Sequence, residues 1–502
     1  MIDNHILGAI FIHLFAAIFQ LIAWRKTVTQ RVISVLGSFL GVLLALRLLF
    51  SVHENGILTL NASNWEAPYG IVFVADLLSA TLVLLTSIAA LAVSFFSSTG
   101  LNRQRMRYGY FPIFHFLIMG LNGAFLTGDI FNLYVWFEVI IISSFVLMTL
   151  GGRKAQLEGA VKYMAMNILA STFFLTGIGI LYGITGSLNM ADLSIKIQQV
   201  QNQWLVGITA CFFIIGFGIK SAVFPLYYWL PSSYHTPPSA VAATFGGLLT
   251  KVGIYAMIRV FSLIFIPDDF TKNLLMVMAV LTIVIGSFGA IIKTNIRRLF
   301  SYLIVCHIGF MIGGIGMFTK VALMGTIFYL IHDIMVKTNL FLIAGVIRQL
   351  RGTMNMLSLG GLYTHYPKIS LLFALVLFSL VGIPPLSGFW PKIYLFDAAF
   401  SQGQLPFAIA LILGSFITLY VIARMWSEVF WKDSPSDIEV EDKFAPLPLF
   451  RKILLILPVG LLCGVTLFIG LNAEIIIQLV DTISDQLLDT TPYVEAVLGK
   501  QN

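Results

Sequence analysis

The chain of 502 residues is 58% hydrophobic and only 11% charged, and its mean hydropathy is +0.93. Soluble domains carry about 25% charged residues, so this composition excludes a soluble globular protein and predicts an all-α polytopic membrane protein. The formal net charge of +7 does not indicate nucleic-acid binding, because the basic residues lie in short loops between apolar runs. The amino-terminal run lacks a basic leader and an obvious cleavage site, which favours a first membrane helix over a removed signal.

Apolar runs long enough to cross a bilayer follow one another along the whole chain. A crossing helix needs about 20 apolar residues, and on that scale the sequence predicts about fourteen spans. Their expected centres, in chain order, are Phe15, Leu43, Leu84, Leu117, Ile140, Phe174, Ile215, Lys251, Ala279, Ile308, Ala344, Pro385, Phe416 and Leu467.

The charge of the loops alternates along the chain. Loops after odd-numbered spans are rich in Lys and Arg, and most loops after even-numbered spans are poor in them, as the positive-inside rule requires. The basic residues of the odd loops are Arg25, Lys26, Arg31, Arg103, Arg105, Arg107, Arg153, Lys154, Lys162, Lys293, Arg297, Arg298, Arg348, Arg351 and Lys368. We therefore expect the odd loops in the cytoplasm and both termini on the outer side.

Two segments of the chain resemble each other. The stretch FPLYYWLP at 224–231 is similar to PPLSGFWP at 384–391, and each is followed by a Tyr-x-x-x-Arg, at Tyr255 and at Tyr420. The predicted repeat unit is five spans. Because an odd number of spans reverses direction, the two copies are expected to be inverted, as in secondary transporters whose sites lie near the midplane.

The repeat divides the chain into four expected parts. They are an N-terminal three-helix segment (1–107), a first repeat with spans four to eight (108–267), a second repeat with spans nine to thirteen (268–432), and a cytoplasmic loop with the last span and an outer tail (433–502).

Prolines interrupt the seventh span at Pro225 and the twelfth at Pro384 and Pro385. Proline has no amide donor and its ring clashes with the preceding helical turn. Non-helical backbone at membrane depth is tolerated only where it is buried in protein or lines a wet cavity. We expect both broken helices to line a polar path.

Charged residues lie inside the apolar spans, although each costs roughly 2.5–3.5 kcal/mol at the bilayer centre. The central set is Glu138, Lys220, Lys251 and Lys392, and its single carboxylate does not balance its three lysines. Burial favours the neutral form of an amine, and a nearby carboxylate favours the charged form. We hypothesise that Glu138 holds Lys220 protonated, and that separating this pair expels the proton along the midplane through Lys251 towards Lys392.

The tenth and eleventh spans add further candidates. His332 and Lys337 of the eleventh span are expected to relay the proton. Asp333 is a candidate relay, but its i,i+4 spacing to Lys337 equally fits a structural ion pair. His307 is a candidate relay or a core histidine.

Three other charged residues in the spans are interpreted as structural. Asp76 is expected to fix the third span by a tertiary contact. Arg259 and Arg424 lie near span ends, where long basic side chains can reach the interface.

No motif indicates an enzyme. Cys211, Cys306 and Cys463 lie in apolar runs without metal-ligand spacing and are interpreted as core residues. The sequence has no CxxC, no HExxH and no glycine-rich phosphate loop, so we expect no catalytic residue, no metal site and no cofactor.

Five segments resemble the antiporter-like subunits shared by Mrp-type Na+/H+ antiporters and respiratory complex I. They read TGDIFNLYVWFEVIIISSF, GIKSAVFPLYYWLPSSYHTPPSAVAATFGGLLTKVGIY, RRLFSYLIVCHIGF, HDIMVKTNLF and GIPPLSGFWPK, and the resemblance extends over nearly the whole chain. Glu138 together with Lys392 is most similar to the D-type family of the Mrp antiporters. One complex I branch has lysine in place of the glutamate, and another has glutamate in place of the lysine.

This resemblance implies a fourteen-helix subunit with two inverted five-helix repeats. It implies that Glu138 and Lys220 form the coupling pair and that protons also pass the family's lysine and histidine positions that match Lys251, His332, Lys337 and Lys392. The implied partners are Mrp subunits of the A, B, C, E, F and G types in a bacterial plasma membrane, with protons and Na+ as the transported ions. One feature departs from strict symmetry, because Lys220 precedes its proline break and Lys392 follows its own.

Three interpretations of function remain. The leading one is a proton-translocating subunit of a Na+/H+ antiporter, with the Na+ site at an interface or in a partner, because this midplane is dominated by lysines. The second is a proton-pumping membrane subunit of a redox-driven complex, of the complex I or membrane-bound hydrogenase type. The third is a scaffold that transports nothing.

Overall fold

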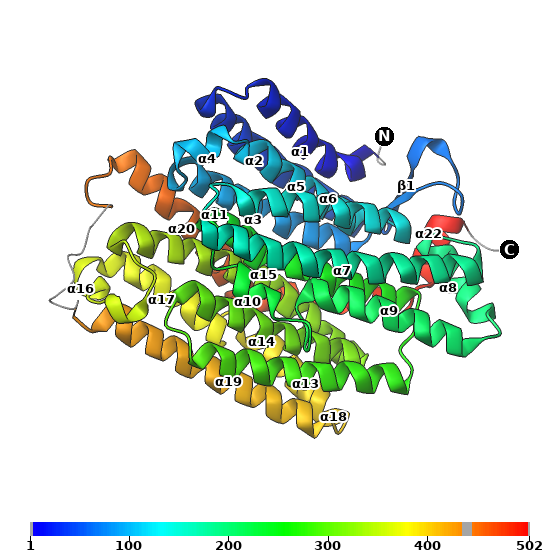
Figure 1. Cartoon of the computed structure of the whole chain (residues 1–502). Coiled ribbons are helices and arrows are strands. Elements are labelled where there is room, and N and C mark those ends of the chain that lie inside the picture. Colours follow the sequence, from blue (N-terminus) through cyan, green and yellow to red (C-terminus); the bar gives the residue numbers. More distant parts are fainter. Residues whose placement is uncertain (1–3, 434–443, 500–502) are drawn as a thin grey trace.

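The structure, a computed structural model, describes residues 4–433 and 444–499 and is almost entirely helical. Figure 1 shows one bundle in which long helices lie side by side. The helices of the first half are α1 (Asn4–Ile22), α2 (Thr27–Asn55), α3 (Leu77–Gly100), α4 (Arg103–Arg107), α5 (Tyr110–Leu126), α6 (Ile130–Thr149), α7 (Lys154–Thr185), α8 (Met190–Lys196), α9 (Gln203–Ser221), α10 (Trp229–Ser233), α11 (Ser239–Thr244) and α12 (Thr250–Leu263).

The second half of the chain is also built mainly of helices. Its helices are α13 (Asp269–Ile291), α14 (Ile296–Met317), α15 (Lys320–Arg351), α16 (Leu362–His365), α17 (Pro367–Val381), α18 (Phe389–Ser401), α19 (Leu405–Trp426), α20 (Leu449–Leu471), α21 (Ala473–Leu488) and α22 (Thr491–Leu498). Short 3-10 turns are η1 (Ala62–Asn64), η2 (Ile197–Gln199) and η4 (Met356–Ser358), and π turns are η3 (Phe245–Leu249) and η5 (Ser427–Trp431). Strands β1 (Leu58–Asn61) and β2 (Val72–Ala75) form an antiparallel hairpin in which Leu58 pairs with Ala75.

Twelve helical segments in the described residues are long and apolar enough to cross a membrane, and α5 and α17 are shorter apolar helices. Thirteen of the predicted span centres lie inside these segments, and Pro385 lies in the break between α17 and α18. The predicted class, a helical multi-pass membrane protein, is confirmed. The number fourteen, the inverted repeats and the four-part division stay predictions, and residues 434–443 of the predicted cytoplasmic loop lie outside the described residues.

Both proline breaks interrupt their helices in the same way. After α9 the chain turns at Ala222, with a φ of 60°, and after α17 it turns at Gly382, with a φ of 89°. In each case an amide reaches back to the preceding helix, from Val223 N to Gly218 O and from Ile383 N to Phe378 O. These bonds satisfy helix-terminal carbonyls as in other left-handed helix ends, and the chain resumes as helix only at α10 and α18.

Two segments are buried over nearly all of their length. They are α15, from Ala322 to Ile347, and the continuous run Ser239–Leu263, which comprises α11, η3 and α12. A helix that is apolar all round belongs in the interior of a bundle. Charged residues on these two segments therefore lie inside protein and away from lipid, which places Lys251, His332, Asp333 and Lys337 together in the core.

The expectation that Arg259 reaches the membrane interface is wrong. Its side chain is buried on α12, and its Nη2 lies 2.6 Å from Oδ2 of Asp76. Because α12 is enclosed on all sides, the guanidinium cannot reach solvent and needs a buried carboxylate instead. Asp76, expected to make a structural contact, also caps α3 by accepting from Ser79 N.

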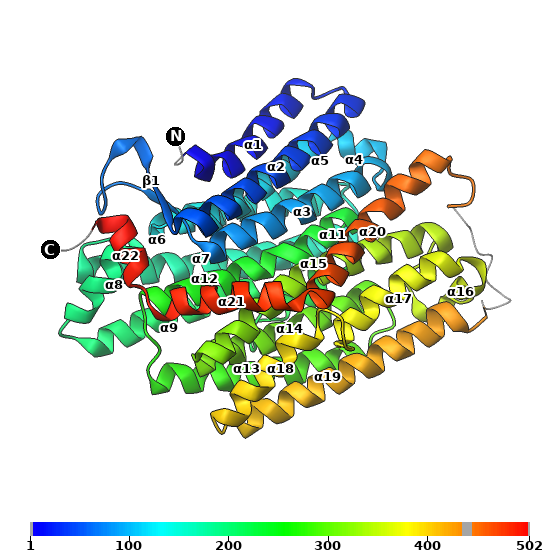
Figure 2. The ribbon, with the colours of Figure 1, turned by 180° about the vertical axis from the view of Figure 1, so that it is seen from behind.

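The two described ends of the chain lie at the same end of the bundle, beside β1 and α22 (Figure 1). Behind them, α20 and α21 extend along the molecule and pack against α15 (Figure 2). The tail after the last predicted span is thus largely helical and covers the buried helix that holds Asp333.

Candidate functional site

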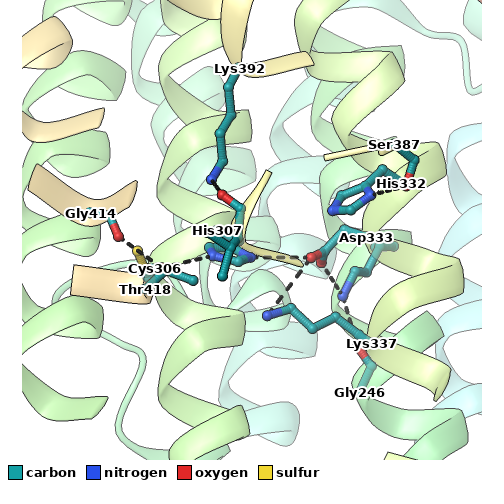
Figure 3. Close-up of polar contacts among 12 residues, drawn as sticks. Gly246, Cys306, His307, His332, Asp333, Lys337, Ser387, Lys392, Gly414 and Thr418 are labelled. Carbon is teal, nitrogen blue, oxygen red and sulfur yellow. Dashed lines mark hydrogen bonds and ion pairs between the residues drawn. The ribbon is translucent and has the colours of Figure 1, made fainter. Parts of the chain in front are cut away.

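Asp333 of α15 is the centre of a buried cluster of charges. Lys251 of α12 lies with its Nζ 2.8 Å from Asp333 Oδ2, and neither side chain is exposed. Lys337, one turn further along α15, is 3.9 Å from Oδ1 of the same carboxylate. His307 of α14 brings its Nδ1 to 3.5 Å from that oxygen. In Figure 3, dashed lines join Asp333 to His307 of α14 and to Lys337 of its own helix.

The cluster has one carboxylate for two lysines. In the described part of the chain, the ammonium of Lys337 has no hydrogen-bond partner, whereas Lys251 also donates to Gly246 O at 2.8 Å. Removing an ion from water costs several kcal/mol unless a partner of opposite charge compensates it. One carboxylate can fully compensate only one of the two ammonium groups, so the second proton is the more easily exchanged one.

The local sequence explains how α12 comes so close to α15. The π turn η3, with the residues FGGLL, directly precedes α12. A Cβ at Gly247 would lie 1.9 Å from Thr338 Oγ1, so only glycine permits this approach. π turns are frequent at functional sites, and this one places Lys251 against both Gly246 and Asp333.

Hydroxyl groups hold the two histidines. His307 Nε2 lies 3.4 Å from Thr418 Oγ1, which donates to Gly414 O on α19. His332 Nδ1 lies 2.8 Å from the hydroxyl of Ser387, a residue of the break between α17 and α18. The broken helix therefore contributes a polar group that was not predicted, Ser387, and the expectation that the prolines line a path stays a prediction.

Lys392 lies at the far side of this cluster. Its Nζ donates to Val381 O at 2.6 Å, at the broken end of α17. It also lies 5.9 Å from the centre of the Phe310 ring, which stacks on His307. A mostly apolar groove of about 520 Å3 beside Lys392 separates the α17–α18 break from α19.

Glu138 and Lys220 lie on α6 and α9, near each other but without an ion pair among the described residues. Glu138 Oε1 accepts from Ser171 Oγ at 2.5 Å, and Lys220 Nζ lies 5.2 Å from the centre of the Phe137 ring. Lys220 lines a cavity of about 20 Å3, which has room for about one water. The structure thus has the expected pair in a separated arrangement, and its coupling role stays a prediction.

Sequence reasoning underestimated Asp333. The i,i+4 contact with Lys337 is present, but the shorter contact is with Lys251, which comes from a distant part of the chain. The available signal was the charge count, because Lys251 in the middle of a span requires a carboxylate. Ser171 and Ser387 gave no signal, since serine is common in packed membrane helices.

Comparisons with known proteins agree with this geometry. Residues 127–418 match a family model described as NADH:quinone oxidoreductase/Mrp antiporter, TM. The chain is 40% identical to the D-type subunit of the Na(+)/H(+) antiporter from Alkalihalophilus pseudofirmus and 39% identical to that from Bacillus subtilis, with 99% of each chain covered in both comparisons.

Solved structures of related chains have the same fold. A chain in the structure of the Mrp complex from Dietzia sp. superposes with a TM-score of 0.90 at 29% identity, covering 99% of both chains. A chain of an archaeal membrane-bound sulfane sulfur reductase superposes with a TM-score of 0.89 at 24% identity, covering 99% of this chain and all of that one. At 24% identity, the likeness to the reductase chain concerns the fold alone.

Proposed function

Because the chain belongs to the NADH:quinone oxidoreductase/Mrp antiporter transmembrane family, we propose that it is the D-type subunit of a multisubunit Na+/H+ antiporter and moves the protons. It is a transporter subunit and not an enzyme. Its partners are other Mrp subunits, expected to be of the A, B, C, E, F and G types.

The observation that most directly supports proton movement is the buried carboxylate shared by two lysines. A cluster with one acid and two bases holds one proton firmly and a second weakly. A small displacement of α15 or α12 changes the 2.8 Å and 3.9 Å separations and so changes which lysine is compensated. A proton can then enter on one lysine and leave from the other.

The proposed proton path has three sites. Glu138 and Lys220 form the first, the Asp333 cluster with Lys251, His307 and Lys337 forms the second, and Lys392 forms the third. Gly253 supports the link between the first two, because a Cβ there would lie 2.3 Å from Ser221 Oγ, next to Lys220. The close packing of α12 on α9 brings the segment that holds Lys251 against the cavity of Lys220.

Coupling follows from the changing distance between Glu138 and Lys220. When the carboxylate approaches, Lys220 is stabilised in its charged form, and when Glu138 turns to Ser171, as here, that stabilisation weakens and the proton passes to the cluster. Moving one charge against 100 mV costs about 2.3 kcal/mol, which is within the range of one buried ion pair.

We also propose that the subunit lies in the bacterial plasma membrane with both termini outside and contains two inverted repeats. Two matching features support the repeats. Helices α7 and α15 both have 32 residues. Each follows a helix whose capping residue forms an isolated antiparallel bridge, Asp129 with Asn189 and Asn295 with Asn355.

The redox-driven alternative is less well supported. The relatives with 40% and 39% identity are named as antiporter subunits, whereas the respiratory reductase chain is 24% identical and the complex I chain from Thermus thermophilus 22%. Those two likenesses concern the fold, which both kinds of complex share.

The proposal is tested with the whole complex in respiring inverted vesicles, by following the Na+-dependent loss of ΔpH with a fluorescent probe. We expect Lys337→Met to slow this response by about a hundredfold, the usual effect of losing an acid–base group. Lys320→Met is the matched control, because that lysine is 41% exposed and pairs with Asp481 and Asp485 at the surface. Equal rates in the two variants would reject the role of Lys337, and no Na+ response in the wild type would favour the redox-driven alternative.

A further inference from the structure

Helices α4 and α11 lie at the end of the bundle opposite the termini (Figure 1). A cavity of about 470 Å3 opens there between the end of α3, helix α4, the start of α7, the loop before α11 and the last turns of α15. Small-molecule sites measure about 300–1,000 Å3, so this cavity can hold a molecule of that class.

Three arginines from separate segments line the cavity. They are Arg105 of α4, Arg153 at the start of α7 and Arg348 in the last turn of α15. No aspartate or glutamate of the described residues lines it. The ion pairs found in residues 4–433 and 444–499 involve none of these arginines.

The convergence of these charges is unfavourable in itself. Burial lowers the pKa of Arg105, and so do the neighbouring Arg153 and Arg348. A fourth arginine, Arg297, is 3% exposed and donates from behind the cavity wall to the carbonyl of Pro237. Like charges that repel one another in one place are stabilised when an anion binds between them.

Membrane topology does not explain this arrangement. The positive-inside rule requires basic residues in the loops at this end, not their convergence on one cavity. Arg103 and Arg107 of the same short helix α4 satisfy that rule and do not line the cavity. Arg105 Nη2 donates to Gln156 Oε1 of α7 at 3.1 Å, and this neutral partner fixes the side chain without compensating its charge.

We infer that this arginine cavity binds a phosphate group, carried by an anionic phospholipid headgroup or present as free phosphate. Guanidinium groups bind phosphate oxygens with paired, charge-assisted hydrogen bonds. Basic pockets between membrane helices on the cytoplasmic side bind such headgroups. Ser239 and Gln349 line the same cavity and supply further donors.

The test uses the whole antiporter complex, purified in detergent and stripped of lipid. Equilibrium binding is measured with three probes: short-chain phosphatidylglycerol, short-chain phosphatidylcholine and inorganic phosphate at constant ionic strength. The variants are Arg348→Gln and Arg153→Gln, both exposed at helix ends, and Arg103→Gln is the control with the same loss of charge. Assembly of the complex is checked for each variant.

We expect phosphatidylglycerol or phosphate to bind to the wild type, and its dissociation constant to rise about tenfold or more in Arg348→Gln and Arg153→Gln. Arg103→Gln is expected to bind like the wild type. Binding of phosphatidylglycerol without phosphate identifies a lipid site, and competition by inorganic phosphate identifies a site for the free anion. The inference is overturned if neither probe binds, or if Arg103→Gln weakens binding as much as the cavity variants do. Antiport activity is not part of this readout, so the result stands apart from the proton path.

Discussion

At the scale of residues, Asp333 determines the chemistry of the core. It is the carboxylate within 4 Å of both Lys251 and Lys337, and His307 shares one of its oxygens. Without it, two buried ammonium groups have no negative partner in their cluster. Breaking a buried ion pair by removing one partner costs about 3–5 kcal/mol, whereas replacing both partners by apolar groups is often neutral.

This asymmetry gives a prediction about stability. Lys251→Met should restore part of the stability that Asp333→Leu removes, because it takes away one of the two buried ammonium groups that Asp333→Leu leaves without a carboxylate. Thermal unfolding of the assembled complex should show a lower midpoint for Asp333→Leu and a recovery in the double variant. Both variants should lack antiport, so recovery of transport together with stability would show that the pair is merely structural.

The hydrogen bond from Ser171 to Glu138 gives a second prediction. Ser171→Ala removes the hydroxyl that holds the carboxylate at 2.5 Å and leaves Glu138 free to approach Lys220. A hydrogen bond to a charged group is worth about 1.5–3 kcal/mol, so the balance between the two arrangements should shift about tenfold or more. We expect the pH profile of antiport activity in vesicles to shift. Thr172→Ala is the control, because that exposed hydroxyl donates to Ile168 O of its own helix, and an equal shift there would contradict this account.

At the scale of elements, the segment Ser239–Leu263 shows how packing creates the site. Its π turn and its two glycines, Gly246 and Gly247, bring α12 against α15. The distance between Lys251 and Asp333 therefore depends on residues that bear no charge.

Gly247→Ala tests this dependence. Its Cβ would lie 1.9 Å from Thr338 Oγ1, and overpacking of this kind costs about 1–3 kcal/mol. We expect a lower unfolding midpoint and a large loss of antiport, with partial recovery when Thr338→Ala is added. Gly179→Ala on α7 is the control, since a Cβ there meets nothing within 4 Å. Normal transport in Gly247→Ala would show that the spacing of α12 and α15 is not critical.

The sequence indicated the elements better than their contacts. Apolar length located the spans, and Pro225, Pro384 and Pro385 located both breaks, because these signals are local. The partners of Asp333 and Arg259 could not be found that way, since Lys251 and Asp76 come from distant segments of the chain. The π turn was also missed, because FGGLL has the composition of an ordinary membrane helix.

At the scale of the whole molecule, two buried ion pairs link distant segments. Lys251–Asp333 joins the predicted first repeat to the second, and Arg259–Asp76 joins the first repeat to the N-terminal segment. Tyr493 of the C-terminal helix α22 packs over Arg259, with 5.3 Å from the guanidinium to the ring centre. Asp76 of the N-terminal segment and Tyr493 of α22 thus both contact the helix that supplies Lys251.

Arg259 should therefore be structural. Arg259→Met leaves Asp76 buried without a partner and should destabilise the complex by about 3–5 kcal/mol, whereas Arg259→Met with Asp76→Leu should recover most of that loss. Thermal unfolding measures the difference. An unfolding midpoint of Arg259→Met equal to that of the wild type would show that the Arg259–Asp76 pair contributes nothing to stability. Arg424→Met, which removes a half-buried arginine bonded to Ile291 O, is the matched control.

The central claim is that protons cross this subunit through the Asp333 cluster. The most direct test is the Na+-dependent loss of ΔpH in respiring inverted vesicles that contain the assembled complex, with wild type compared with Asp333→Asn at equal assembly. Asp485→Asn serves as the control, since its carboxylate is 57% exposed in a surface ion pair. We predict a response in the wild type and the control and none in Asp333→Asn. A full response in Asp333→Asn would contradict the claim and leave the cluster as a structural element of the bundle.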